Sequence, residues 1–127
     1  MNQLIRVMPA IALRGTTILP DMIVHFDISR EKSIRAVEEA MTQDQKIFLV
    51  TQRDPGVEKP SLADLYRIGT VAVIKQVVKM PKNVLRVLVE GVERGELTEL
   101  EEDLPFLEAQ VAGFEPEEEK LSDNVKE

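Results

Sequence analysis

Two short motifs contain the side chains of a serine hydrolase. Ser29-Arg30-Glu31-Lys32 has S-x-x-K spacing at the start of a predicted helix, and Ser122-Asp123-Asn124 has S-D-N spacing. In the penicillin-recognising serine enzymes these motifs act together with a third motif, K-T-G, which is absent here. A chain of 127 residues is also too short for that fold. We therefore predict that Ser29 caps a helix and is not a nucleophile.

The remaining reactive residue types form no constellation that predicts chemistry. His25 is the only histidine, and it lies on the more polar face of a predicted strand, so we expect it to be solvated or hydrogen-bonded. The acidic clusters 99–103 and 115–119 lack the glycine turn of a calcium loop. Phosphate-loop, nucleophile-elbow and H-E-x-x-H motifs are missing, as is cysteine. The sequence therefore predicts a binding module without catalytic residues, metal or cofactor.

The charge is divided unevenly along the chain. The net charge of −7 is the sum of +3 over residues 1–95 and −10 over residues 96–127. With a nearly balanced body, one Tyr and no Trp, the chain has few of the features of a nucleic-acid binder. Its apolar runs are too short to cross a membrane.

A long β-hairpin is the strongest predicted element. Residues 70–80 and 84–94 form its arms, and Pro81-Lys82-Asn83 forms a turn in which Asn83 tolerates the left-handed conformation. The first arm is rich in β-branched residues, and in the second Leu85, Val87 and Val89 alternate with more polar positions. Gly91 interrupts that alternation, which predicts a bend or bulge that curls the sheet.

The other elements are predicted from periodicity. Strands are expected at 5–13, 22–28, 47–50 and 106–114, a helix at about 30–42, and a short helix opened by Ser61 and Asp64. This order predicts an α+β domain that is mostly β, with a curled sheet, one main helix and the central hairpin. From Glu115 the apolar pattern ends, so we expect the domain to span residues 1–114 and residues 115–127 to form an acidic linker.

Several blocks of the sequence resemble the amino-terminal domain of bacterial ATP-dependent Lon proteases. The resemblance spans about residues 5–114, with one departure at Ala12, where the family usually has proline. The matching blocks are Leu13-Arg14, His25–Ser33, Ala36–Met41, Ile47–Asp54, Asp64–Thr70 and Leu85–Arg94.

This resemblance implies a PUA-like pseudo-barrel that selects and holds damaged or unfolded polypeptides. It also implies a full-length, cytoplasmic, homohexameric enzyme of the AAA+ class, which uses ATP and Mg²⁺ to degrade misfolded, damaged and short-lived regulatory proteins. The helical region, the ATPase module and the Ser-Lys peptidase would all lie beyond Glu127, so no catalytic residue can be assigned here. Two alternatives stay open: a nucleic-acid-binding module and a domain that serves mainly oligomer assembly.

Apolar residues in predicted loops are the candidates for substrate contact. Loops normally carry polar residues, and methionine adapts to partners of varied shape, so apolar loop residues suggest an adhesive surface. The alternative is that these residues pack into the core or against another subunit. The candidates lie in the connector between the first two strands and beside the hairpin tip: Ile18, Leu19, Pro20, Met22, Met80 and Val84.

Overall fold

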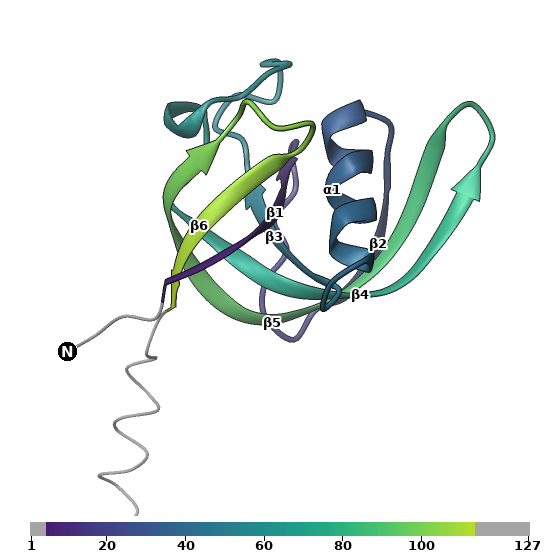
Figure 1. Cartoon of the computed structure of the whole chain (residues 1–127), viewed down its shortest axis with the longest axis horizontal. Helices are drawn as coiled ribbons and strands as arrows, with labels where there is room; N and C mark the ends of the chain where they lie inside the picture. Colours follow the sequence, from purple (N-terminus) through teal and green to yellow (C-terminus); the bar gives the residue numbers. More distant parts are fainter. Residues whose placement is uncertain (1–4, 114–127) are drawn as a thin grey trace, which may run out of the picture.

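The computed structural model describes residues 5–113 (Figure 1). The predicted acidic linker 115–127 and its S-D-N motif lie outside the described residues. Eight elements follow one another in the predicted order. They are β1 (Ile5–Leu13), β2 (Ile23–Ile28), α1 (Glu31–Met41), β3 (Lys46–Thr51), the 3-10 turn η1 (Leu62–Asp64), β4 (Ile68–Met80), β5 (Val84–Glu101) and β6 (Leu107–Gly113).

The strands form one curled sheet that closes over part of its length. Their order is β2-β5-β4-β3-β1-β6, and β6 also pairs with β5, so β5, β4, β3, β1 and β6 form a closed ring. Among the described strands, only β1 and β3 run parallel, and every other pair is antiparallel. β2 is outside the ring, and β5 is its one partner within residues 5–113.

β5 is long enough, at 18 residues, to take part in two different structures. Its second half belongs to the barrel, and its first half forms a three-stranded sheet with β2 and the outer part of β4. We call the barrel the closed half. The three-stranded sheet is the open half, comprising β2, residues 74–80 of β4 and residues 84–90 of β5. A register shift opposite Val92 separates the two halves, directly after Gly91, as the sequence predicted.

Phe48 is the largest side chain of the barrel core and is fully buried. Two strand positions beside it are glycine: a Cβ at Gly69 would lie 2.6 Å from the Phe48 ring, and one at Gly95 would lie 3.3 Å from it. The ring therefore occupies the space that two side chains would otherwise fill. The other buried members of this core are Met8, Ala10, Ala12, Val50, Leu65, Val71, Leu97, Leu107, Ala109 and Val111.

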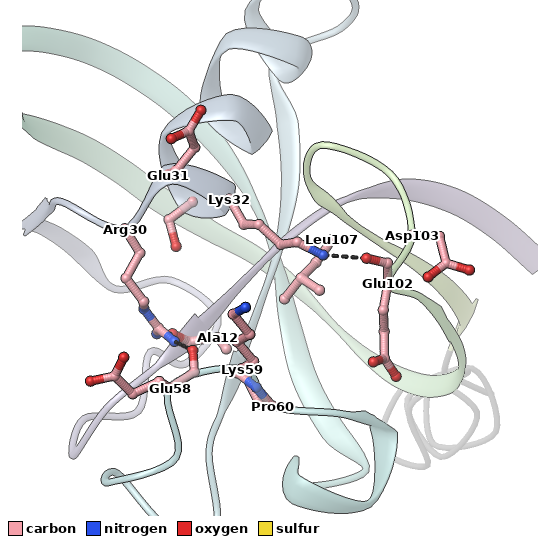
Figure 2. A pocket seen from close by; sticks show the side chains of 11 residues that line it. Ala12, Arg30, Glu31, Lys32, Glu58, Lys59, Pro60, Glu102, Asp103 and Leu107 are labelled. Atoms are coloured by element: carbon pink, nitrogen blue, oxygen red, sulfur yellow. Dashed lines mark hydrogen bonds between the residues drawn. The ribbon is translucent and has the colours of Figure 1, made fainter.

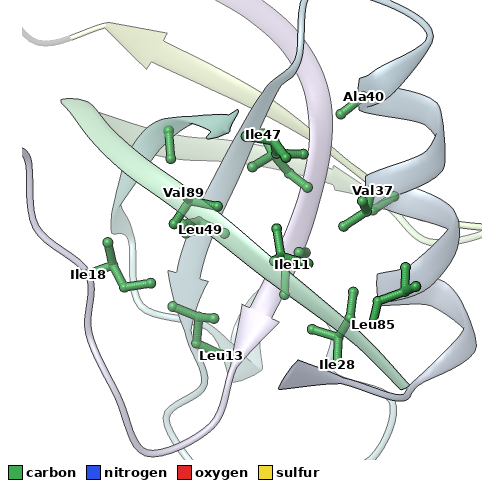
Figure 3. Packing of buried hydrophobic residues seen from close by; sticks show 14 residues of the cluster. Ile11, Leu13, Ile18, Ile28, Val37, Ala40, Ile47, Leu49, Leu85 and Val89 are labelled. Atoms are coloured by element: carbon green, nitrogen blue, oxygen red, sulfur yellow. The ribbon is translucent and has the colours of Figure 1, made fainter. Parts of the chain in front are cut away.

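A second core lies between α1, the outer wall of the barrel and the inner face of the open half (Figure 3). In Figure 1, α1 stands between the barrel strands and the projecting β4–β5 hairpin. Its buried residues Ser33, Ala36, Val37 and Ala40 recur at helical spacing. Ala36, Val37 and Ala40 belong to one buried cluster with apolar residues of five strands, including Ile11, Ile28, Ile47, Leu49, Ile74, Leu85, Val87 and Val89.

The predicted inner face of the hairpin is confirmed, because Leu85, Val87 and Val89 are all buried. The turn also follows the prediction: Asn83 has φ of 60°, and Lys82 is left-handed as well, with φ of 66°. Ser61 and Asp64 form their predicted contact, with the Ser61 N–H donating to Asp64 Oδ2 at 2.9 Å. The predicted α+β class, mostly β with a curled sheet, is therefore confirmed.

Two local predictions are wrong. The helix N-cap is Arg30 and not Ser29, and no side chain caps the helix there. β5 continues to Glu101, well beyond the predicted end at residue 94, because its second half pairs with β6. Among the described residues, no helix is long and apolar enough to cross a membrane.

Candidate functional site

The open half has two faces, and only one of them is covered by α1. Strand alternation places every second side chain on the opposite face, which we call the outer face. The ladder pairs His25 with Leu88 and Leu88 with Gln76, and in the next row it pairs Asp27 with Arg86 and Arg86 with Val78. The outer face comprises Ile23, His25, Asp27, Gln76, Val78, Met80, Val84, Arg86, Leu88 and Glu90.

Three apolar side chains, one from each strand of the open half, are at least partly accessible on this face. Ile23 is 64% exposed and Val78 is 40% exposed, while Leu88 is half-buried. A shallow hollow of about 260 Å³ is lined by His25, Gln76, Val78, Arg86 and Leu88. Its lining combines the apolar side chains of Val78 and Leu88 with the hydrogen-bonding groups of His25, Gln76 and Arg86.

The charges of the outer face neutralise one another. Arg86 donates from Nε to Asp27 Oδ1 at 2.8 Å and from a terminal nitrogen to Asp27 Oδ2 at 3.2 Å. This hydrogen bonding lowers the pKa of Asp27 and raises the pKa of Arg86. Lys75 pairs with Glu90 at 3.4 Å. A binding partner therefore meets a partly apolar surface with little net charge. Such a surface does not select for a particular charge pattern in the partner.

Ile18 does not belong to any accessible surface. Its side chain is only 4% exposed and lies in the core near Leu13 and Leu49 (Figure 3). The Ile18 carbonyl accepts a hydrogen bond from the buried Thr70 hydroxyl at 2.6 Å. The prediction that this loop residue is exposed is therefore wrong. The connector lies flat on the sheet, which buries the residue despite its position between strands.

The rest of the connector is partly exposed. Leu19 is 46% exposed, Pro20 is half-buried, and Met22 packs against the core while its sulfur accepts the Leu19 N–H at 3.2 Å. The connector lies close to the sheet at Gly91, where an added Cβ would meet the Leu19 carbonyl oxygen at 2.3 Å. Gly91 is thus required for the approach of this loop.

Met80 and Val84 lie at the other end of the open half. They pair across the hairpin tip, are half-buried, and belong to the outer face. From Val84 to Gly91 the strand advances seven residues, roughly 23 Å at about 3.3 Å per residue. The two predicted groups therefore do not form one patch. The side chains between them, Ile23, Val78 and Leu88, were not predicted, although their alternation with buried neighbours was visible.

Arg30, Glu31 and Lys32 of the S-x-x-K motif line a second cleft, of about 410 Å³, at the start of α1 (Figure 2). Arg30 donates to the carbonyl of Ala12 at 2.6 Å and to that of Glu58 at 3.2 Å, and its burial lowers its pKa. Lys32 donates to the Glu102 carbonyl across the cleft (Figure 2). Arg30 therefore joins the start of the helix to β1 and to the loop at Glu58, and Lys32 joins it to the loop at Glu102. Ser29 lines an adjoining cleft.

His25 is exposed on the outer face, which agrees with its predicted place on the polar side of a strand. Within residues 5–113, no group of three or more His, Asp or Glu side chains is arranged to hold a metal ion. The arrangement of the outer face supports contact with a partner and offers no constellation for a reaction.

A comparison with protein families identifies this chain's relatives. The model described as the ATP-dependent protease La (LON) substrate-binding domain matches residues 7–127. Lon protease of Clostridium acetobutylicum is 46% identical over 117 residues, which is 92% of this chain. Lon protease of Desulforamulus reducens is 45% identical over 120 residues, or 94% of this chain. In each case the chain spans about 15% of the relative's length.

Solved structures share the fold at much lower identity. The N-terminal domain of Mycobacterium avium complex Lon protease superimposes with a TM-score of 0.70 at 17% identity, covering 87% of this chain and 56% of that one. The Lon N-terminal domain protein of Xanthomonas campestris gives a TM-score of 0.67 at 15% identity, covering 94% and 70%.

Proposed function

Because this chain belongs to the family of Lon protease substrate-binding domains, we propose that it selects and holds unfolded or damaged polypeptides through its outer face. The observation that carries this proposal is an apolar strip of exposed Ile23 and Val78 and half-buried Leu88, with its neighbouring charges paired. Unfolded segments share apolar side chains but no common sequence, so a surface of this kind can bind many of them.

The wider proposal concerns the protein of which this domain would be part. We propose a cytoplasmic homohexamer in which this domain, residues 1–114, delivers misfolded, damaged and short-lived regulatory proteins to an ATPase that uses ATP and Mg²⁺. A Ser-Lys peptidase would then cleave them. Residues 115–127 would link the domain to a helical region. The chain itself contributes binding and no step of the reaction.

Met80 and Val84 extend the proposed surface toward the hairpin tip, because both belong to the outer face. Leu19, Pro20 and Met22 would form a separate, smaller contact at the opposite end. Ile18 is left out, since its burial makes it part of the core. The proposal therefore places most substrate contact on the strands of the open half and less on the connector.

Two strand residues of nearly equal exposure provide a matched test. Val78 in the open half is 40% exposed, and Ile68 in the closed half is 42% exposed on the same strand. We expect Val78→Ser to weaken binding of reduced and carboxymethylated α-lactalbumin, measured by fluorescence anisotropy. Ile68→Ser should bind as the parent does. Both variants should keep their stability within about 1 kcal/mol, as surface changes usually do.

Equal effects of the two substitutions would contradict the proposed location, because exposed apolar area anywhere would then suffice. Unchanged binding by both variants would place the substrate elsewhere. Leu19→Ser and Met80→Ser, made singly, then separate the contribution of the connector from that of the hairpin tip. The two substitutions are tested in separate variants, because Leu19 and Met80 lie at opposite ends of the open half.

A further inference from the structure

β2 has one unpaired edge. β2 pairs with β5 on one side, and none of the described residues pairs with its other side. The direction of the backbone groups follows from one hydrogen bond: the Gly91 N–H donates to the Met22 carbonyl at 2.8 Å, so this carbonyl points toward β5. The Gly91 carbonyl accepts from the Asp21 N–H, also at 2.8 Å, so Asp21 and Met22 form a bulge opposite Gly91. Beyond the bulge, residues whose backbone groups face β5 alternate with residues whose backbone groups face away. Val24, Phe26 and Ile28 therefore point their backbone groups toward β5.

The intervening residues point their backbone groups away from the sheet. These are Ile23, His25 and Asp27, and within residues 5–113 no hydrogen bond engages their N–H or C=O groups. Three backbone N–H donors and three C=O acceptors are therefore spaced along this edge, at every second residue. Their side chains lie on the outer face, so the free edge borders the proposed binding surface directly.

Open space adjoins this edge. The lining of a cleft of about 230 Å³ includes Phe26 and Asp27 of β2 together with Leu13, Arg14 and Thr16. None of the described residues that line it belongs to β5, so it lies on the side of β2 away from the ladder. The cleft gives an approaching chain access to the edge of β2.

The edge also lacks the usual protection against strand pairing. Proteins commonly block an edge with lysine, proline or a bulge. β2 contains neither lysine nor proline, and its one acidic residue, Asp27, is paired with Arg86. The bulge of Asp21 and Met22, in which Asp21 is left-handed with φ of 71°, lies before the strand, and the pairing from Ile23 to Ile28 has no register shift. An unprotected edge of six residues is a hazard unless a partner uses it.

We infer that an unfolded polypeptide binds by adding a strand to the free edge of β2. This inference rests on the proposed function and specifies how the substrate is recognised. Backbone groups are common to all polypeptides, so pairing through them needs no fixed sequence. Alternate side chains of the added strand would then lie beside Ile23 and His25 on the outer face, where the paired charges impose little selection.

Amide hydrogen exchange of the unaltered protein tests the inference directly. Reduced and carboxymethylated α-lactalbumin is the probe. Without it, the amides of Ile23, His25 and Asp27 should exchange quickly, while those of Val24, Phe26 and Ile28 are protected by β5. With the probe bound, the first three should become protected. If the probe binds and their exchange does not change, strand addition is overturned while the proposed function stands.

Two variants at one position give an independent test. His25→Pro removes an outward N–H and leaves the ladder to β5 intact, since proline is tolerated where the N–H faces solvent. His25→Ala removes the side chain and keeps the N–H. We expect His25→Pro to bind the probe about fivefold more weakly than His25→Ala, the usual effect of one hydrogen bond. Circular dichroism verifies that both variants are folded.

Three other outcomes would overturn the inference. Equal affinities of two folded His25 variants would show that the outward N–H is not used. Protection of the three amides without probe, rising with protein concentration, would show that the edge pairs with a second copy of this chain. Failure of the unaltered protein to bind the probe at all would overturn the proposed function together with this mode of recognition.

Discussion

In the closed half, every strand has two neighbours along at least part of its length and the interior is filled by side chains around Phe48. In the open half, β2 has one neighbour among the described strands, one face of the sheet packs on α1 and the other is exposed. Both halves share β4 and β5. The difference therefore arises from what pairs with these strands, because β1, β3 and β6 close the barrel whereas β2 leaves an edge.

The two halves of the sheet therefore differ in role. Ring closure removes strand edges, which protects the barrel from unwanted pairing. The open half keeps an edge and an apolar face, and it can do so because α1 and the barrel wall hold its inner face in place. The closed half thus supports the open half, whose surface is available to partners.

The largest expected difference between the two halves is the loss of stability when a side chain is truncated to alanine. Phe48→Ala should lower the free energy of unfolding by about 3–5 kcal/mol, because it empties the centre of the barrel. Val78→Ala, on the exposed face of the open half, should change it by about 0.5 kcal/mol or less. Urea denaturation measures both. Comparable losses would show that the outer face is more deeply packed than its exposure indicates.

A smaller contrast is expected between two glycines. In Gly69→Ala the new methyl group would meet the backbone oxygen of Leu49 and the Phe48 ring, each at 2.6 Å, so we expect a loss of about 1–3 kcal/mol. Gly56 is the control, since its nearest atom is 3.4 Å away and its φ is not left-handed. Gly56→Ala should be neutral or slightly stabilising. A tolerated Gly69→Ala would mean that the barrel expands easily.

The smallest expected effect concerns the ion pair on the outer face. Because the pKa of Asp27 is lowered in the folded state, the pair contributes stability above the unfolded pKa of Asp, which is about 3.9. That contribution is lost as the pH falls through the folded pKa. We expect only a slight change in stability, since both side chains are 45% exposed. In an NMR titration, Arg86→Ala should raise the pKa of Asp27 toward its ordinary value.

Alternation and turn chemistry were enough to predict most elements. The buried positions Leu85, Val87 and Val89, the turn at Asn83 and the bulge beside Gly91 all follow from local rules. The length of β5 did not follow, because its second half contains glycine and charged residues that are stabilised only by pairing with β6. Closure of the ring depends on such distant contacts.

The candidate site was predicted less well, because its exposure also depends on contacts between residues that are distant in the sequence. Apolar residues in the connector suggested exposure, but Ile18 is covered because the loop folds back onto the sheet beside Gly91. Exposed strand residues such as Ile23 and Val78 could not be distinguished from core residues by type alone. Which face of the open half is covered depends on where α1 packs, and alternation does not specify that.

The pairing of β1 with β6 also determines when the domain can form during its synthesis. Ile5 pairs with Ala112, so the first described strand lacks this neighbour until almost all of the domain has left the ribosome. At roughly 5–20 residues per second, that interval lasts roughly 5–20 s. The β4–β5 hairpin is the most local pairing of the sheet and should form first, whereas ring closure is the last step of the nascent chain. Until then the edge of β1 that pairs with β6 has no neighbour among the described strands.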